Sequence, residues 1–294
     1  MSVFLQFLFS GLTTGAVYAM VGLGFNIIYN ATSIINLAQG EFVVIGGLMM
    51  WYFSEAMKLP FFISAILAVA STGLIGLLME RLTIRPVKKS DLLLMIMITI
   101  AVSIVLRGIL MFKFGKDPYT YAPFTEGEPI HIYGAFIQQQ TLWVIGITLF
   151  FIILIFLFFN KTMLGKAMKA CAVNPVAARI TGINVDKMVM LSFVLSAMMG
   201  AVAGIAVTPI TLMEYDRGPM LAVKGFCAAI MGGLGRGRGS VIGGFIIGIL
   251  ESMTAGYIHS GAKDAVALVI ILVILFFKPA GIFGSKTIAD LRRF

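Results

Sequence analysis

The sequence predicts an all-α polytopic membrane protein, a helical bundle of about eight or nine transmembrane helices in a single domain over 1–294. Of the 294 residues, 60% are hydrophobic and 12% are charged, whereas a soluble domain carries roughly 25% charged residues. Several nearly uncharged runs also exceed the roughly 20 residues that a helix needs to cross a bilayer core. These runs must be helical, because hydrocarbon offers no partner to an unpaired backbone amide.

The apolar runs define nine candidate spans. They are 3–29, 31–53, 60–80, 92–114, 141–159, 188–213, 220–235, 240–258 and 264–277. The second span is polar in its first half, and the seventh is short and contains Lys224, so each could be a broken or re-entrant helix. The first apolar stretch has neither a basic start nor a small-residue cleavage site, and we therefore expect it to be retained as a span.

The loops between these spans differ in charge. One set carries 15 of the 22 basic residues and four acids, and the other carries five basic residues and seven acids. The basic set comprises Arg81, Arg85, Lys88, Lys89, Lys161, Lys166, Lys169, Arg179, Lys187, Arg236, Arg238, Lys278, Lys286, Arg292 and Arg293. An excess of Lys and Arg marks cytoplasmic loops, so we expect the N-terminus outside and the C-terminus in the cytoplasm. Charges scattered over short loops also argue against a nucleic-acid-binding face.

Two loops are long enough to have structure of their own. Loop 160–187 belongs to the basic, cytoplasmic set, and loop 115–140 is the longest one outside. In the outward loop, 129–137 alternates in a way that favours a small hairpin.

Three spans carry small residues at every fourth position. This spacing lets helix backbones approach closely in lipid, so we expect most of these glycines to serve packing rather than gating. The rows are Ser64, Ala68, Thr72 and Gly76; Ser192, Ser196, Gly200 and Gly204; and Ser240, Gly244, Gly248, Ser252 and Gly256.

The cytoplasmic loop contains signals for a short helix. Asn174 is a good N-cap, Pro175 suits the first turn, and Gly182 suits the position after the last turn. The resulting helix is centred on Ala177 and Ala178, whose small side chains would let a partner groove approach closely. A helix lying on the membrane surface explains the pattern equally well, because two lysines precede it.

Nothing in the sequence indicates catalysis, a cofactor or a metal site. The glycine-rich stretch 232–240 lacks the lysine of a phosphate-binding loop and is better explained as a tight turn between spans. His131 and His259 are too few and too far apart for a metal site, and Cys171 and Cys227 do not indicate a disulfide framework. We therefore expect a protein that is not an enzyme.

Six short segments in order resemble one known family, the H-type permease subunits of branched-chain amino-acid (Liv) ABC importers. The resemblance covers nearly the whole chain. The segments are 15–20 (GAVYAM), 34–41 (IINLAQGE), 80–82 (ERL) with 85–86 (RP), the loop 165–185, 224–226 (KGF) leading to 232–235 (GGLG), and 278–284 (KPAGIFG).

The resemblance implies a single permease domain in a bacterial inner membrane. Its implied partners are a second homologous permease, two ATP-binding cassette subunits, a periplasmic or extracellular substrate-binding protein and membrane lipid. The implied substrates are branched-chain or other hydrophobic amino acids. A related ABC permease for urea, short amides or another small solute is an alternative, and a stand-alone secondary transporter or channel is a more distant one.

The resemblance also assigns an ATPase-docking motif to the cytoplasmic loop. Ala177 and Ala178, followed by Gly182, are similar to the core of the motif by which importer permeases contact their ATPases. The glutamate that usually leads the motif is Val176 here, and its downstream part is absent. The implied docking set is Asn174, Pro175, Ala177, Ala178, Arg179 and Gly182.

Five polar residues within the spans are candidates for a translocation path, because polar groups in a membrane are costly and usually functional. The set is Asn36, Gln39, Glu41, Lys224 and Glu251. They could bind the ammonium and carboxylate groups of a zwitterionic amino acid in passing. The structural alternative is that Glu41 pairs with Lys224 or caps a broken helix.

Overall fold

The computed structural model describes residues 2–87, 91–125, 127–132, 134–278 and 281–283. Its helices are α1 (Ser2–Thr32), α2 (Gln39–Trp51), α3 (Phe61–Met79), α4 (Leu92–Phe114), α5 (Gln139–Lys161), α6 (Met163–Val173), α7 (Pro175–Ile180), α8 (Val185–Thr211), α9 (Gly218–Gly232), α10 (Gly237–Tyr257) and α11 (Lys263–Phe277). The π-helical segments η1 (Tyr52–Ala56) and η2 (Glu80–Ile84) extend α2 and α3, and the short 3₁₀ helix η3 (Ser260–Ala262) precedes α11. Two strands, β1 (Ile130–Ile132) and β2 (Ala135–Ile137), pair antiparallel.

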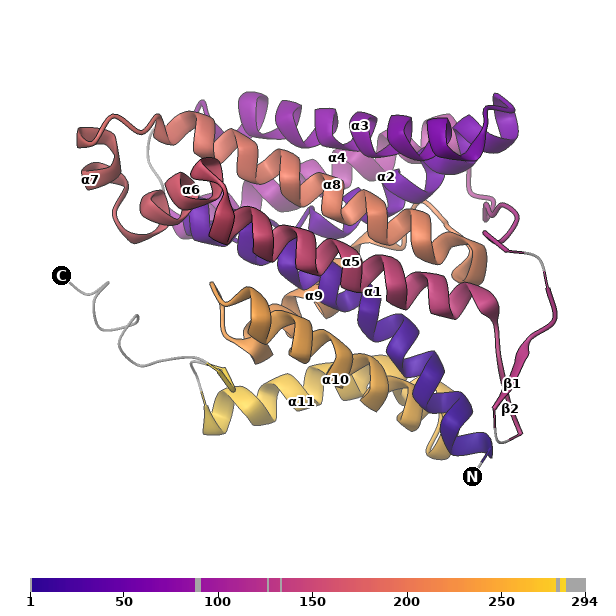
Figure 1. The fold of residues 1–294 in the computed structure, drawn as a ribbon. Coiled ribbons are helices and arrows are strands. Elements are labelled where there is room, and N and C mark those ends of the chain that lie inside the picture. The colour runs from indigo at the N-terminus through magenta and orange to yellow at the C-terminus, as the bar shows by residue number, and fades with distance from the viewer. Residues whose placement is uncertain (1, 88–90, 126, 133, 279–280, 284–294) are drawn as a thin grey trace.

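The long helices run between two ends of the molecule, as Figure 1 shows. The short helices α6 and α7 lie at one end, and the N-terminus and the β1–β2 hairpin lie at the other (Figure 1). The central helix α1 packs most extensively against α10, α8 and α9, whereas α2 is held between α8, α3 and α9. The predicted hairpin is confirmed by the pairing of Ile130 with Ile137.

Seven of the described helices are long and apolar enough to cross a membrane. They are Ser2–Thr32, Phe61–Ile84, Leu92–Phe114, Gln139–Lys161, Val185–Thr211, Gly237–Tyr257 and Ser260–Phe277. The prediction of a helical polytopic membrane protein is therefore confirmed. The two spans expected to be irregular, 31–53 and 220–235, correspond to the shorter helices α2 and α9.

Both irregular spans were predicted with wrong limits. The first half of 31–53 is not one helix, because α1 continues to Thr32 and α2 begins only at Gln39. Ser33 has a φ of 59°, which α-helical backbone does not allow, so the helix must stop there. The second, α9, has 15 residues and ends at Gly232, before Gly233 with a φ of 89°. This turn confirms the interpretation of the glycine-rich stretch.

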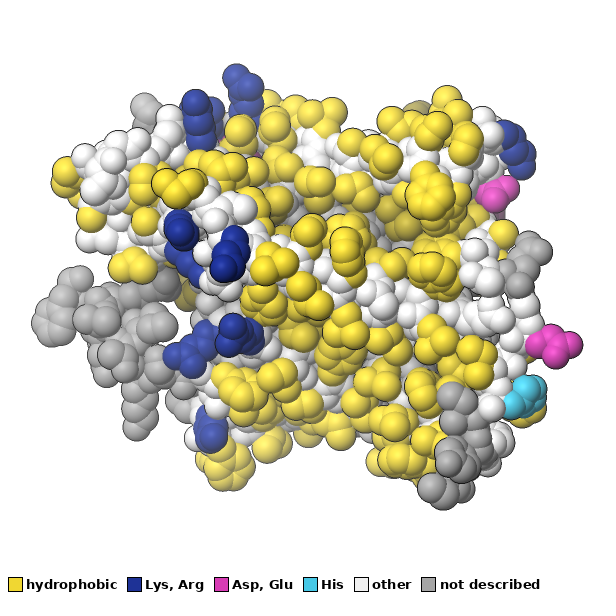
Figure 2. All heavy atoms as spheres, viewed as in Figure 1, with side chains coloured by type: hydrophobic (Ala, Val, Ile, Leu, Met, Phe, Trp, Pro, Cys, Tyr) yellow, Lys and Arg dark blue, Asp and Glu magenta, His cyan; other side chains and the backbone are white. Residues whose placement is uncertain are grey.

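The outer helices expose apolar side chains, as lipid-facing helices do. Large side chains of α3, α4, α5 and α11 are exposed along their lengths, whereas most of α8 is buried. Figure 2 shows hydrophobic side chains across the middle of one face, with Lys and Arg gathered at the end where α6 and α7 lie. The basic residues Lys88, Lys89, Lys286, Arg292 and Arg293 of the predicted cytoplasmic set lie outside the described residues.

Small residues allow the central helices to touch. A Cβ added at Gly248 of α10 would collide with the backbone of Gly15 on α1, and one at Gly204 of α8 would collide with the carbonyl oxygen of Val43 on α2. The predicted packing role of these rows is confirmed, because the glycines stand where two helix backbones meet.

Candidate functional site

Two short helices begin inside the bundle and meet at their N-terminal ends. A Cβ added at Gly40, in the first turn of α2, would collide with the carbonyl oxygen of Gly218, the first residue of α9. Position 40 therefore requires glycine, whereas a Cβ at Gly218 would meet the side-chain carboxylate of Glu41. Because a helix N-terminus carries a partial positive charge, this junction directs two such ends toward the protein interior.

The segment that leads into α2 is non-helical and largely buried, so its polar backbone groups need partners within the protein. Asn36 is fully buried, and its Oδ1 accepts a hydrogen bond from the amide of Ala38 at 3.1 Å. The amide of Leu37 donates to Oγ1 of Thr99 on α4 at 3.2 Å. The segment is therefore anchored to α4, while Nδ2 of Asn36 is left without a partner.

Glu41 projects from the first turn of α2 and is fully buried. Its Oε1 accepts a hydrogen bond from Ser103 at 2.7 Å and lies 3.4 Å from Nε of Arg107. Ser103 is the middle residue of α4, so the carboxylate lies near the midplane of that span. The other oxygen, Oε2, has no hydrogen-bond partner and lies against Gly218, at the N-terminus of α9. We call Glu41, Ser103, Arg107 and Asn36 the junction cluster.

Arg107 is the only charged residue between the ends of α4. Its side chain is 32% exposed, although it sits only one turn from the middle of the helix. A charge at this depth is costly in contact with lipid, so this side of α4 must adjoin another protein surface or water.

The side chain of Gln39 is hydrogen-bonded to a neighbouring helix at both of its polar atoms. Its Nε2 donates to the carbonyl oxygen of Ser196 on α8 at 3.1 Å, and its Oε1 accepts from the hydroxyl of Ser196 at 2.6 Å. That hydroxyl also lies 2.8 Å from the carbonyl oxygen of Gly24 on α1. The side chain therefore links α2, α8 and α1, and both of its polar atoms are occupied.

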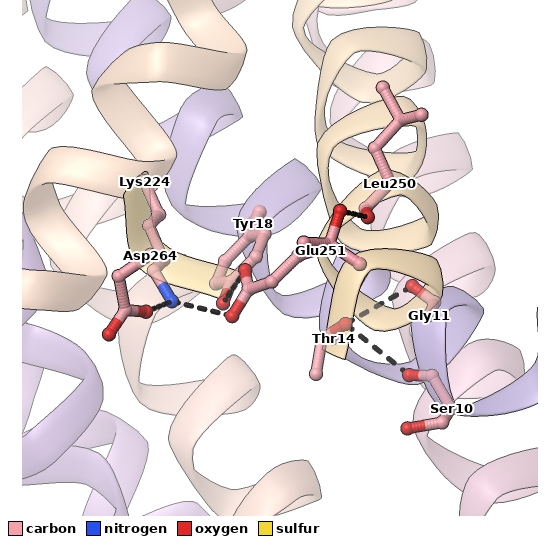
Figure 3. Close-up of polar contacts among 9 residues, drawn as sticks. Ser10, Gly11, Thr14, Tyr18, Lys224, Leu250, Glu251 and Asp264 are labelled. Atoms are coloured by element: carbon pink, nitrogen blue, oxygen red, sulfur yellow. Dashed lines mark hydrogen bonds and ion pairs between the residues drawn. The ribbon is translucent and has the colours of Figure 1, made fainter. Parts of the chain in front are cut away.

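Lys224 and Glu251 belong to a second cluster, shown in Figure 3. Nζ of Lys224, on α9, lies 2.7 Å from Oε1 of Glu251 on α10 and 2.6 Å from Oδ1 of Asp264 on α11. The hydroxyl of Tyr18, on α1, donates to Oε2 of Glu251 at 2.8 Å. We call these four residues the tethering cluster, because they join four helices (Figure 3).

The five predicted path residues are thus divided among three places: Asn36 and Glu41 belong to the junction cluster, Gln39 links α2 to α8 and α1, and Lys224 and Glu251 belong to the tethering cluster. The structural alternative that Glu41 pairs with Lys224 is wrong, because each has other partners. Sequence reasoning missed Ser103 and Arg107, although their spacing of four residues within an apolar span places both on one helix face. It also missed Asp264, which lies in the first turn of α11 and was counted among the acids of the outward loops.

The loop 160–187 contains the predicted capped helix α7. Oδ1 of Asn174 accepts hydrogen bonds from the amides of Val176 and Ala177, each at 3.0 Å, and Gly182 follows the helix with a φ of 87°. Pro175 occupies the first turn. Of the two central alanines, Ala178 is buried against its own chain and only Ala177 is exposed.

The tip of this loop presents apolar side chains. Val173, Val176 and Ile180 are 88%, 68% and 82% exposed. Arg179 is also exposed and forms an ion pair with Asp186 at 3.6 Å. An apolar tip on a basic end of the molecule is a surface suited to a protein partner.

The seven long apolar helices place this chain in the class of polytopic membrane proteins, and it carries charged side chains in its interior. The chain belongs to the family whose description is branched-chain amino acid transport system / permease component, and the family model matches residues 7–277. Family membership makes it a permease subunit, which is a pore component of a multi-pass membrane transporter.

Individual relatives match along almost their whole length. The chain is 30% identical to the high-affinity branched-chain amino acid transport system permease protein LivH of Escherichia coli (strain K12), with 97% of each chain covered. It is 26% identical to the corresponding protein BraD of Pseudomonas aeruginosa, again with 97% of each covered. The fold is similar to a chain of PsaBC from Streptococcus pneumoniae in complex with Fab, at a TM-score of 0.50 and 16% identity over 94% and 93% of the two chains.

Proposed function

We propose that this permease is one half of the pore of an ABC importer for branched-chain or other hydrophobic amino acids. The observation that most strongly supports this proposal is the match of nearly the whole chain to permeases named for branched-chain amino acid transport. The supporting geometry is the junction cluster, which combines a carboxylate, a guanidinium and helix N-termini at the depth of the membrane interior.

Glu41 and Arg107 are proposed to contact the substrate as it passes. A free amino acid carries an ammonium group and a carboxylate. The unpartnered Oε2 of Glu41 can accept from the ammonium group, and Arg107 together with the N-terminus of α9 can stabilise the carboxylate. Asn36 offers its unpartnered Nδ2 as a further donor. Gln39, Lys224 and Glu251 hold the surrounding helices in place.

A second homologous permease is proposed to cover the side of α4 that exposes Arg107. Ile100, Ile104 and Met111 lie on the same face of α4 as Arg107 and are 41%, 56% and 42% exposed, so this side is apolar apart from the guanidinium. A partner subunit would keep the charge away from lipid and would place the junction cluster beside a path between the two subunits.

Two ATP-binding cassette subunits are proposed to drive transport by binding at α7. The sequence has no phosphate-binding loop of its own, and the exposed tip of α6 and α7 offers apolar contact area beside Ala177. A periplasmic binding protein would deliver the substrate at the opposite end, where the β1–β2 hairpin lies (Figure 1).

The proposed orientation has the N-terminus outside and the C-terminus in the cytoplasm of a bacterial inner membrane. The gathering of Lys and Arg at the α6–α7 end supports it (Figure 2). In this arrangement α2 and α9 are partial spans from opposite sides, which completes nine membrane-embedded elements beside the seven long helices.

Reconstitution tests the proposed function. Liposomes containing the two permeases, the ATPases and the binding protein should take up leucine, isoleucine or valine only in the presence of ATP. Uptake by this chain alone, or uptake of urea but not of amino acids by the full assembly, would contradict the proposal.

Substitution at Ala177 tests the docking surface. Ala177→Glu places a charge where a helix should fit closely into a partner, and the ATPases should no longer co-purify with the permease. The matched control is Ala170→Glu, the same change at an exposed position of α6. Co-purification of the ATPases with Ala177→Glu would show that α7 is not the docking element.

Single-cysteine labelling tests the orientation. Background labelling should be low, because Cys171 and Cys227 are both buried and burial also raises the pKa of the Cys171 thiol. An impermeant maleimide should label Glu128→Cys on intact cells, and should label Lys187→Cys only after permeabilisation. The reverse pattern would overturn the topology.

A further inference from the structure

A half-open cavity of about 760 Å³ lies at the α6–α7 end of the molecule. It is bounded by the last turns of α1, the end of α5, α6 and the turn that leads into α10. None of the proposed path residues lines it, and of the apolar tip of α6 and α7 only Val173 does. We call it the basic cavity after its three cationic residues, Lys169, Arg236 and Arg238.

Among the described residues, the cations of the basic cavity have no acidic counterpart: no Asp or Glu lines the cavity, and none of the three cations forms an ion pair with a carboxylate. Nζ of Lys169 donates to Oδ1 of Asn160 at 2.6 Å, and the guanidinium of Arg238 lies 5.7 Å from the ring centre of Phe156. These contacts orient the two side chains without neutralising them.

Other features of the basic cavity add positive potential. Helix α10 begins at Gly237, on the cavity wall, with no acidic residue in its first turn and no side-chain cap. Arg236, directly before it, donates to the carbonyl oxygen of Phe283 and keeps its charge. The cavity therefore combines three cations with a helix N-terminus, which is a strong site for an anion.

The walls of the basic cavity are apolar and continue onto the membrane-facing surface. Ile155, Phe156 and Phe159 of α5 and Ile242 of α10 line it. Ile242 is 43% exposed, so the apolar wall reaches the outside. Figure 2 shows the blue Lys and Arg side chains at this end directly beside the hydrophobic band. Phosphate groups of the cytoplasmic leaflet lie at this boundary when the basic end faces the cytoplasm.

We propose that the basic cavity binds the phosphate headgroup of an anionic phospholipid of the cytoplasmic leaflet. Lys169, Arg236 and Arg238 would contact the phosphodiester, and the acyl chains would lie along α5 and α10. Free phosphate shares the charge but cannot use the apolar walls, so the geometry favours the lipid.

Lipid binding by the full chain in detergent tests the proposal. Native mass spectrometry should show retained phosphatidylglycerol and much weaker retention of phosphatidylcholine at equal concentration. Inorganic phosphate at millimolar concentration should not displace the phosphatidylglycerol. Equal retention of the two lipids, or displacement by inorganic phosphate, would overturn a lipid site.

Charge-neutral variants locate the site. Arg236→Gln with Arg238→Gln should weaken phosphatidylglycerol binding roughly 30-fold, given the contribution of each basic residue to anionic lipid binding. The control, Arg81→Gln with Lys187→Gln, removes the same charge from exposed positions at the same end and should bind as the wild type does. Equal losses in both pairs would show attraction without a defined site. Lys169→Gln alone, on the surface of α6, should lower the affinity for phosphatidylglycerol about fivefold. This single variant replaces the double variant as the test if the double variant does not fold.

Discussion

The junction cluster and the tethering cluster both place charge inside the bundle, but they differ in how completely their polar atoms are satisfied. In the tethering cluster, Lys224 bonds two carboxylates and both oxygens of Glu251 have partners. In the junction cluster, Oε2 of Glu41, Nε of Arg107 and Nδ2 of Asn36 all lack a hydrogen-bond partner. Among the described residues, one other buried side-chain atom, Oε2 of Glu80, shares that condition.

This difference is the basis on which we propose that the tethering cluster is structural and that the junction cluster contacts the substrate. Buried polar groups in proteins are almost always hydrogen-bonded, because an unpartnered one costs about 1–3 kcal/mol. A network with all its bonds made stabilises one arrangement of helices. A network in which some donors and acceptors lack partners is suited to a ligand that binds and leaves, as we propose for a transported amino acid.

The largest effect is expected from breaking the tethering cluster. Lys224→Met leaves Glu251 buried beside Tyr18 without its cation, and the loss of one partner of a buried pair costs about 3–5 kcal/mol. We expect a sharp fall in the thermal midpoint and in the yield of folded protein. Adding Glu251→Leu removes the stranded charge and should restore most of the stability. A single variant as stable as the wild type would show that the cluster tethers nothing.

The same substitution in each cluster sharpens the comparison. Glu41→Gln keeps shape but removes the charge proposed to meet the substrate ammonium group, and uptake per assembled complex should fall about tenfold or more, the value of one charged hydrogen bond. Glu251→Gln should instead lower the thermal midpoint and leave uptake per complex unchanged. The measurement is ATP-driven uptake normalised to assembled complex. Unchanged normalised uptake in Glu41→Gln would reject its role in the path.

The smallest effect is expected from deleting one hydroxyl in each cluster. Ser103→Ala removes the 2.7 Å bond to Glu41, and Tyr18→Phe removes the 2.8 Å bond to Glu251. Each deletion should cost about 0.6 kcal/mol, the average for a side-chain hydrogen bond between helices in a membrane. For Ser103 the loss should be seen as a several-fold change in uptake, and for Tyr18 as a small fall in thermal midpoint. If both variants change the same property, the two clusters do not differ in role.

Local sequence signals were sufficient for much of the fold. Long apolar runs predict the membrane helices, because hydrocarbon forces the backbone to bond within each segment. The capped helix at Asn174 follows from side-chain and backbone preferences within a few residues, and so does the β1–β2 hairpin. The family resemblance rests on short segments of the same kind, and the match over 7–277 confirms it.

The limits of α2 and α9 were harder to predict. Hydropathy recognises a span by its length, and both helices are short: α2 is also polar at its start, and α9 carries Lys224 in its middle. Gly40 and Gly218 allow the N-terminal ends of the two helices to touch. The sequence contains 32 glycines, however, and it does not indicate which backbone segment each of them contacts.

The sequence by itself determined that this chain is a helical membrane permease, and it marked Asn36, Gln39, Glu41, Lys224 and Glu251 as polar residues within the membrane spans. Only the tertiary structure decided which of them share a site. Glu41 meets Arg107 and Lys224 meets Asp264 because of how α2, α4, α9 and α11 are rotated and packed. Hydropathy is a property of each segment alone, whereas a pairing between distant segments depends on the geometry of both.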